Sequence, residues 1–281
     1  MSASGSSDRI RTLRETLAGL EQAGGGMAPA PVRTLAFGQE SCTLDRLLGG
    51  LFSGALYETA PARMGDLAAA TGFALALAVR FAASHDGPIL WMSDEFSLRE
   101  NGAPYGPGVA AHGLDVARLV FVRAQSGPDL LWAMEEALRC GAACALVADL
   151  GSAARAFDLV AARRLTQAAR TSGAPAILLH PAGAFSRPQA QNGARMRFEI
   201  TARPSVLPVQ HTIRPVPGPA HVGVRLAKPG IEARSEPGRM TGLDTDITRT
   251  LIWDHRHGVF RDPLSLAASA ASGAGDRRDS A

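Results

Sequence analysis

The chain of 281 residues is almost without lysine: Lys228 is the only one, against 28 arginines. A working phosphate loop needs a lysine after a glycine, because its ammonium group reaches the terminal phosphates of a nucleotide. Lys228 follows Ala227 late in the chain, and no Gly-Lys pair occurs anywhere in the sequence. This absence argues against an ATPase of the phosphate-loop class.

Cysteine is also scarce, with Cys42, Cys140 and Cys144 and no Cys-x-x-Cys pair. An odd number of cysteines without that spacing argues against a disulfide framework and fits a reducing cytosol. Cys140 and Cys144 are four residues apart, but Cys144 lies in an apolar run. We therefore expect buried thiols that act as small hydrophobic side chains rather than a metal or redox pair.

Long hydrophobic runs are missing as well. Residues 1–8 are polar and do not resemble a secretory signal. The most apolar stretch, Leu67–Val79, contains Thr71 and Gly72 and is shorter than a membrane-spanning helix. We expect a cytoplasmic protein that makes no contact with a membrane.

The composition that remains is that of a globular domain, with 46% hydrophobic and 20% charged residues in 29.3 kDa. A chain of this size can bury a large core without metals or disulfides. Residues 32–263 are predicted to form that core. Residues 264–281 are rich in Ala, Ser and Gly and are predicted to be a disordered tail.

The first segment has the pattern of an amphipathic helix over residues 8–22. Its apolar residues recur at spacings of three and four and are Ile10, Leu13, Leu17 and Leu20. Three glycines and a Pro/Ala-rich stretch follow, so residues 1–31 are predicted to form a helix and a flexible linker outside the core. The apolar stripe either docks on a partner or packs back on the chain's own core.

Short apolar runs alternate with helical patterns in the middle of the chain, which is typical of a parallel β-sheet with crossover helices. Strands are predicted at 55–59, 88–92, 119–123, 144–149 and 176–180, and helices at 66–83, 128–140 and 157–171. Ser126 is expected to cap the second of these helices, and Gly173 to end the third. Further strands at 196–202, 221–226, 250–253 and 258–260 have no helices between them, which favours antiparallel pairing at one edge of the sheet.

Positive charge gathers in this last part of the chain. Nine arginine and lysine residues lie between Arg187 and Arg239, against three glutamates. This predicts a basic face on the C-terminal strands. The face either contacts nucleic acid or consists of solvated arginines on edge strands and loops.

The strand, turn and helix over residues 55–83 lie where α/β proteins place a phosphate loop. The turn does not carry, in the order that a phosphate loop requires, the glycines, the lysine and the hydroxyl that bind phosphate and magnesium. Asp66 is expected to cap the helix and to repel a phosphate from its N-terminus. We therefore expect a degenerate site that binds no nucleotide, at positions Pro61, Arg63, Gly65 and Asp66.

Acidic residues follow two other predicted strands, namely Asp94, Glu95 and Asp149. Carboxylates at strand ends can activate water or hold magnesium, but without a phosphate loop we expect turn or capping roles for them. His255 and His257 lie two residues apart without a cysteine or carboxylate cluster, which makes a poor metal site. We expect no catalytic residue, no metal site and no cofactor.

Several segments, in this order and spacing, resemble the ImuA family of RecA-like proteins. They are Leu44–Glu58, Leu90–Glu95, Tyr105–Asp115, Leu130–Leu138 and Asp158–Leu165. The resemblance runs from about residue 8 to residue 260 and implies an α/β, RecA-like fold with a mostly parallel sheet flanked by helices. Glu95 matches the catalytic base of RecA, but it and Asp149 are vestigial here because the phosphate-loop lysine and hydroxyl have no counterpart.

The resemblance further implies a non-catalytic adaptor that acts in damage-induced mutagenic translesion synthesis. The implied partners are an ImuB-like Y-family protein, an error-prone replicative-type polymerase subunit and RecA itself. Candidate contact residues are those of the N-terminal stripe together with Arg195, Arg197 and Arg225 on the basic strands.

Two alternatives to the adaptor stay open. One is a RecA-class ATPase with Arg63 in place of the lysine and Glu95 as base, although the planar guanidinium fits a lysine's place poorly. The other is a DNA-binding module that uses the basic C-terminal strands, with an affinity that falls steeply with salt.

Overall fold

The structure is a computed structural model and describes residues 29–38, 42–185, 193–205, 218–229 and 248–263. Its elements are β1 (Thr34–Leu35), α2 (Thr43–Leu48), β2 (Leu51–Phe52), β3 (Leu56–Pro61), η1 (Met64–Asp66), α3 (Leu67–Ala82), β4 (Ile89–Asp94), α4 (Glu95–Asn101), α5 (Gly106–Ala111), η2 (Val116–Arg118), β5 (Leu119–Ala124), α6 (Gly127–Cys140), β6 (Ala145–Asp149), η3 (Gly151–Arg155), α7 (Leu159–Ser172), β7 (Ala176–Leu179), β8 (Met196–Arg203), β9 (His221–Pro229), β10 (Thr248–Asp254) and β11 (Val259–Arg261). The predicted N-terminal helix, with Ile10, Leu13, Leu17 and Leu20, and the predicted tail lie outside the described residues.

Nine strands form one sheet in the order β11-β10-β9-β8-β3-β7-β6-β4-β5. The strands from β8 to β5 in this order pair in parallel, and β8 to β11 pair antiparallel. The predicted α/β fold with antiparallel C-terminal edge strands is therefore confirmed. The sequence places the predicted strand 196–202 among the antiparallel strands, whereas the observed β8 also pairs in parallel with β3 and joins the two parts of the sheet.

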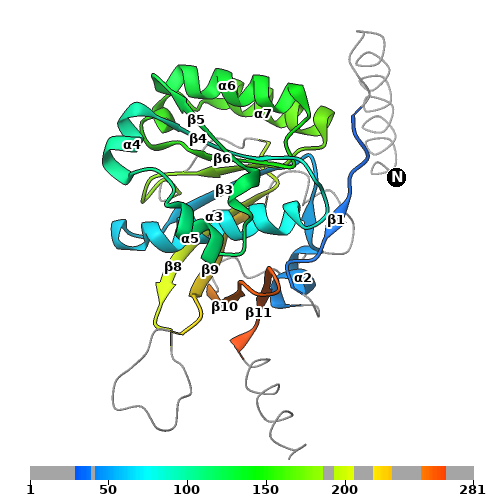
Figure 1. Cartoon of the computed structure of the whole chain (residues 1–281), viewed down its shortest axis with the longest axis vertical. Helices are drawn as coiled ribbons and strands as arrows, with labels where there is room; N and C mark the ends of the chain where they lie inside the picture. Colours follow the sequence, from blue (N-terminus) through cyan, green and yellow to red (C-terminus); the bar gives the residue numbers. More distant parts are fainter. Residues whose placement is uncertain (1–28, 39–41, 186–192, 206–217, 230–247, 264–281) are drawn as a thin grey trace, which may run out of the picture.

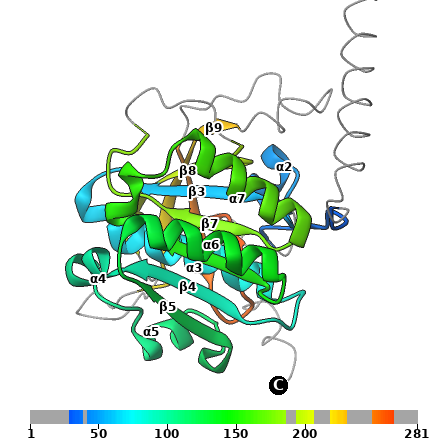
Figure 2. The same cartoon turned by 90° about the horizontal axis from the view of Figure 1, so that it is seen from above.

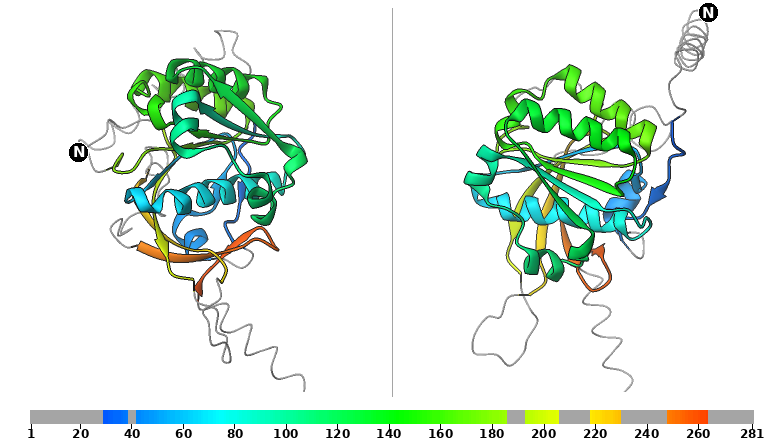
Figure 3. Two further views of the ribbon diagram at one scale, coloured as in Figure 1. Left: turned by 60° about the vertical axis from the view of Figure 1, so that its left-hand side comes forward. Right: turned by 45° about the horizontal axis from the view of Figure 1, so that its top comes forward.

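Helices cover both faces of the sheet (Figure 1). Helices α6 and α7 lie side by side on one face, which Figure 2 shows from above, and α3 lies on the other. Because successive strand residues point to opposite faces, Leu56 of β3 belongs to the core under α6 and α7, whereas its neighbour Tyr57 belongs to the core around α3. The C-terminal strands curve around α3, as Figure 3 shows.

Four buried phenylalanines form the centre of the core around α3. The ring of Phe198 in β8 lies 6.2 Å from that of Phe37 and 5.3 Å from that of Phe73. Phe260 in β11 contacts the same two rings at 6.4 and 5.3 Å. Phenylalanines from near both ends of the described chain thus pack together against α3.

The capping residues predicted from the sequence mark the start of α6 and the end of α7 in the structure. The Ser126 hydroxyl accepts a hydrogen bond from the backbone N–H of Asp129, and Gly173 ends α7 in the left-handed conformation, so both predictions are confirmed. The sequence analysis does not predict the short elements β1, β2, α2, α4 and α5. Each has seven residues or fewer, which is too short to show a clear hydrophobic periodicity. Cys144 is buried as predicted. The predicted burial of Cys140 is wrong, because Cys140 is the last residue of α6 and is exposed to solvent.

One stretch among the described residues has the length and apolar composition of a membrane-spanning helix. It is Met64–Ala82, with 19 residues. The expectation that the apolar stretch Leu67–Val79 is too short to span a membrane is therefore wrong on length, because the helical structure around it runs from Met64 to Ala82. More than half of Met64–Ala82 is buried, and the core helix of a soluble protein passes the same test of length and composition. Packing against the sheet therefore accounts for its apolar character.

Candidate functional site

The turn between β3 and α3 lies at the carboxyl edge of the parallel sheet, where α/β proteins bind ligands. Strand β3 ends at Pro61, and a turn of 3-10 helix over Met64–Asp66 leads into α3. A side chain added at Gly65 would meet no atom within 4 Å. Gly65 is therefore not required here for a close approach of backbone, unlike the glycines that wrap a phosphate.

Asp66 fills this turn with a buried carboxylate. Its Oδ1 accepts a hydrogen bond from the backbone N–H of Ala202 at 2.9 Å, and its Oδ2 lies 3.3 Å from Nε of the exposed Arg63. Burial alone would raise the pKa of Asp66, but the Ala202 amide and the Arg63 guanidinium stabilise the carboxylate more strongly and hold the pKa below its ordinary value of 3.8. The position thus carries a negative charge, which disfavours an anionic ligand.

The predicted capping role of Asp66 is wrong. Asp66 precedes α3, but its side chain makes no capping hydrogen bond to the helix. Its backbone dihedrals, φ −94° and ψ 3°, differ from the extended conformation that a capping residue adopts. The carboxylate turns sideways to β8 instead, so it ties the degenerate turn to the C-terminal strands.

The substitution Asp66→Asn is expected to lower the free energy of unfolding by about 1.5–3 kcal/mol at neutral pH, as for hydrogen bonds to a charged group. Because the pKa of Asp66 is lower in the folded chain than its ordinary 3.8, ionised Asp66 stabilises the fold above that pH. This contribution is lost as pH falls through the folded pKa. Urea unfolding of both proteins along a pH series measures it, and a difference that persisted unchanged in strong acid would contradict it.

The acidic residues at the end of β4 and the start of α4 are held by internal contacts. Asp94 caps α4 by accepting a hydrogen bond from the backbone N–H of Ser97 at 2.7 Å, and it accepts another from the Ser152 hydroxyl at 2.5 Å. Glu95 forms an ion pair with Arg123 at 2.5 Å. Asp94 thus has the capping role expected from its place at a strand end.

Asp149 at the end of β6 belongs to the same edge. It accepts hydrogen bonds from the Asn101 amide at 3.0 Å and from the backbone N–H of Gly151 at 3.1 Å. Burial raises the pKa of its carboxyl, and the charge of Asp94 adds to the effect. These contacts give Asp149 the turn role expected from the sequence.

A buried charged group lies beneath this edge and is absent from the sequence-based predictions. Glu58 in β3 is fully buried, and Nε of Arg197 in β8 donates to its Oε2 at 2.6 Å. His180, which follows β7, places Nε2 4.0 Å from the same oxygen and packs between Phe157 and Phe185. Burial lowers the pKa of His180 and favours the neutral imidazole.

The three arginines expected to contact partners have different surroundings. The guanidinium of Arg195 lies 3.9 Å from the centre of the Phe52 ring. Arg197 is buried at Glu58, and Arg225 is paired with Glu199 at 2.5 Å. The structure therefore does not bring these three side chains together on one open basic face.

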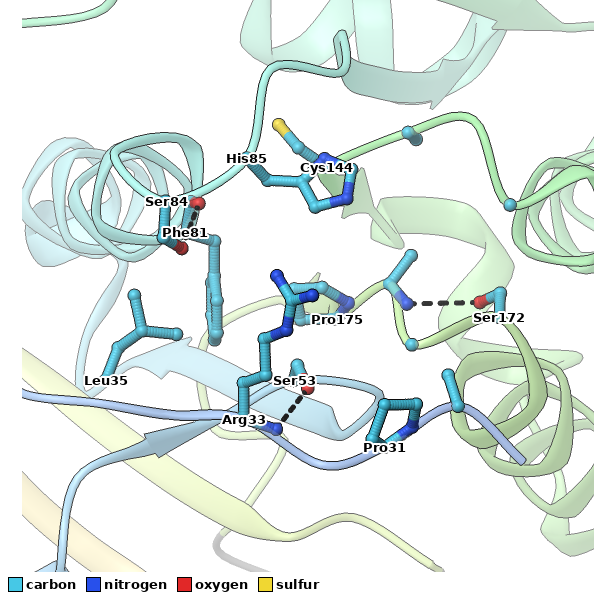
Figure 4. Close-up of a pocket in the computed structure, with 15 residues that line it drawn as sticks. Pro31, Arg33, Leu35, Ser53, Phe81, Ser84, His85, Cys144, Ser172 and Pro175 are labelled. Carbon is cyan, nitrogen blue, oxygen red and sulfur yellow. Dashed lines mark hydrogen bonds between the residues drawn. The ribbon is translucent and has the colours of Figure 1, made fainter.

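A small pocket lies at the opposite, amino edge of the sheet (Figure 4). It encloses about 120 Å³, less than the roughly 300 Å³ of the smallest usual ligand sites. Arg33 extends into it, and the backbone N–H of Arg33 donates to the Ser53 hydroxyl at 2.8 Å. The neighbouring Ala30 N–H bonds to the carbonyls of Arg170 and Thr171, so residues 30–35 cross this edge. None of the predicted site residues lines this pocket.

A wider hollow of about 620 Å³ lies between the end of α5 and strand β10. His255 lines it, whereas His257 bonds to Asp254 at 2.8 Å through Nδ1. Across the described part of the chain, no three His, Cys, Asp or Glu residues are grouped as metal ligands would be.

Comparison with known proteins finds two related sequences. The chain is 31% identical over 189 residues to "Protein ImuA" of Caulobacter vibrioides (strain NA1000 / CB15N), a match that covers 64% of this chain and 72% of the relative. "Protein ImuA" of Caulobacter vibrioides (strain ATCC 19089 / CIP 103742 / CB 15) matches with the same identity and coverage. No protein-family model matches the chain.

Proposed function

Because the chain belongs to the ImuA family, we propose that it is a non-catalytic accessory protein of damage-induced SOS mutagenesis in the cytoplasm. It works as an adaptor through protein contacts. Its partners are an ImuB-like Y-family protein, an error-prone replicative-type polymerase subunit and RecA. The N-terminal stripe and the exposed parts of the C-terminal strands are the first candidates for these contacts.

The observation that carries the non-catalytic part of the proposal is the buried carboxylate of Asp66 in the turn after β3. A phosphate bound there would meet a negative charge at the entry to α3, where nucleotide-binding proteins present free backbone N–H groups. Arg63, the one cation in this turn, already lies beside that carboxylate. A phosphate would have to compete with Asp66 for it, which supports an adaptor over an ATPase.

The arrangement at Glu95 supports the same proposal. The ion pair with Arg123 engages the carboxylate that would serve as base in an ATPase. A general base has to accept a proton from the attacking water. One oxygen of the Glu95 carboxylate is already bound by the Arg123 guanidinium, so a water at that oxygen would have to displace Arg123.

Complementation of a deletion strain tests the proposal. Deletion is expected to lower the frequency of ultraviolet-induced mutations, and the wild-type chain and Glu95→Gln are expected to restore it equally. An ATPase with Glu95 as base predicts restoration by the wild type alone. Unchanged mutation frequency in the deletion strain would overturn the accessory role itself.

Calorimetry with ATP and magnesium tests the non-catalytic part separately, with RecA from the same organism as the positive control. We expect no binding heat from the chain under conditions in which RecA binds. Micromolar affinity of the chain for ATP would overturn this part of the proposal and leave the accessory role standing.

A further inference from the structure

The outer surface of helices α6 and α7 carries apolar side chains that nothing in the described structure covers. Trp132 on α6 is 63% exposed and Val160 on α7 is 61% exposed. The other two tryptophans of the chain, Trp91 and Trp253, are only 5% and 3% exposed. Exposed tryptophan is uncommon on a monomer surface and enriched at the centres of protein interfaces.

An ion pair between Glu135 and Arg164 joins the two helices. Glu135 on α6 binds Arg139 at 2.5 Å through one carboxylate oxygen, and Arg164 of α7 at 2.6 Å through the other. Trp132 precedes Glu135 by three residues, and Val160 precedes Arg164 by four, so each apolar residue shares a helix face with a member of this cluster. We call the surface formed by Trp132, Arg139, Val160, Arg163 and Arg164, with Glu135 buried beneath it, the α6–α7 face.

The α7 side of this face has a surplus of positive charge. Helix α7 contains three arginines and no acidic residue, and Asp158 before it caps the helix by accepting from the backbone N–H of Ala161. The charge of Glu135 is matched by Arg139 and Arg164, which are each more than half exposed. Arg163 is exposed and forms no ion pair with any of the described residues.

We propose that the α6–α7 face binds an acidic segment of a protein partner, with an apolar side chain on Trp132 and Val160 and carboxylates at Arg163 and Arg164. The proposal rests on the adaptor function above and names the chemistry of one of its contacts. Tryptophan and arginine are the residue types whose contacts dominate interface energies. The guanidinium of Arg164, already fixed by Glu135, presents its remaining N–H donors to a carboxylate with little further loss of freedom.

Charge on α6 favours a protein segment over nucleic acid. Glu136 is exposed on α6, and Asp129 lies three residues before Trp132. A nucleic-acid strand carries a negative charge at every nucleotide, so one that crossed both helices would meet these carboxylates. A protein segment can confine its acidic residues to the side that meets α7.

Fluorine NMR of the full chain labelled with 5-fluorotryptophan tests the proposal, because unlabelled partners stay silent. Three resonances are expected, and Trp132→Phe identifies the one from the α6–α7 face. The purified ImuB-like protein, polymerase subunit and RecA are added one at a time, with calorimetry in parallel. We expect at least one of them to shift the Trp132 resonance and to leave those of Trp91 and Trp253 in place.

Two substitutions and a matched control sharpen the result. Trp132→Ala and Arg163→Glu are each expected to weaken that binding by about tenfold or more, the effect of losing one strong interface contact. Arg99→Glu makes the same change of charge at an exposed site on α4 and is expected to leave the affinity unchanged. Both arginines lie on the surface, so the fold tolerates the reversal.

The remaining outcomes separate the two proposals. Calorimetric binding with an unmoved Trp132 resonance and full affinity of Trp132→Ala would overturn the α6–α7 face and leave the adaptor function intact. Absence of binding to all three proteins would overturn the adaptor function and this surface with it. A Trp132 shift caused by the chain's own concentration, or by a single-stranded oligonucleotide, would identify a second copy or nucleic acid as the occupant and overturn the proposal.

Discussion

Replacing Arg197 by alanine is expected to lower the free energy of unfolding by about 3–5 kcal/mol, the range found when one partner of a buried ion pair is removed. Arg197 is 7% exposed, and Glu58 is completely buried at 2.6 Å from its Nε. Removal of the guanidinium leaves the Glu58 carboxylate in the core without this charged donor. The energy of that buried charge, rather than the lost packing of one side chain, sets the size of the effect.

His180 cannot replace the missing guanidinium near neutral pH. Its Nε2 lies 4.0 Å from the Glu58 carboxylate and has no hydrogen-bond partner among the described residues. Burial lowers the pKa of His180, so the neutral ring is favoured in the folded chain. His180 is therefore not expected to compensate the deficit of Arg197→Ala at pH 7.

Urea unfolding measures the loss, and Arg225→Ala is the matched control. Arg225 pairs with Glu199 at 2.5 Å, but both side chains are partly exposed. Its removal is expected to cost about 1 kcal/mol or less. Equal losses for the two variants would contradict the view that Arg197 belongs to the core, whereas partial recovery of stability in Glu58→Gln with Arg197→Met would support it.

The pairing of Glu58 with Arg197 shows why sequence patterns miss such groups. The two residues are 139 positions apart and become direct neighbours only through the parallel register of β3 and β8. No local spacing relates them. The composition shows that arginines are concentrated late in the chain. Which of them is buried in the core depends on the pairing register of β3 and β8. Arg197 was therefore a natural candidate for a partner contact by sequence and is a buried ion-pair member in the structure.

The wrong prediction of a capping role for Asp66 has the same cause, namely a partner far away in the sequence. An acidic residue before a helical pattern predicts a cap, because capping depends on groups two or three residues away. The carboxylate instead binds the N–H of Ala202, which is 136 positions distant. Ser126 and Gly173 behave as predicted because their partners lie within a few residues of them.

The parallel sheet itself was predictable for a physical reason. Its inner strands are covered on both faces, so they are recognisable as short apolar runs without any knowledge of their neighbours. Strands β6 and β7 are buried at every residue and lie within a residue of their predicted bounds.

Phe198→Ala is expected to lower the free energy of unfolding by about 3–5 kcal/mol, as for other fully buried phenylalanines replaced by alanine. The ring of Phe198 is fully buried between those of Phe37 and Phe73. The loss includes the transfer of the ring from the core and the cavity that the rigid neighbours leave open. Phe96→Ala is the control, because Phe96 is 59% exposed and its removal is expected to change stability by about 0.5 kcal/mol or less.

Phe198→Ala also tests how the segment around Phe37, at the start of the described chain, is attached to the core. The Phe37 carbonyl accepts a hydrogen bond from the N–H of Phe260, and the Phe37 N–H donates to Asp45 at 2.6 Å. With Phe198 gone, these bonds lose the packing that excludes water from them, so hydrogen exchange at Phe37 and Phe260 is expected to rise more than at the strands under α6 and α7. Uniform acceleration across the sheet would mean that the aromatic cluster stabilises the whole domain without holding this segment in particular. A loss below about 1 kcal/mol would mean that neighbouring side chains collapse into the cavity.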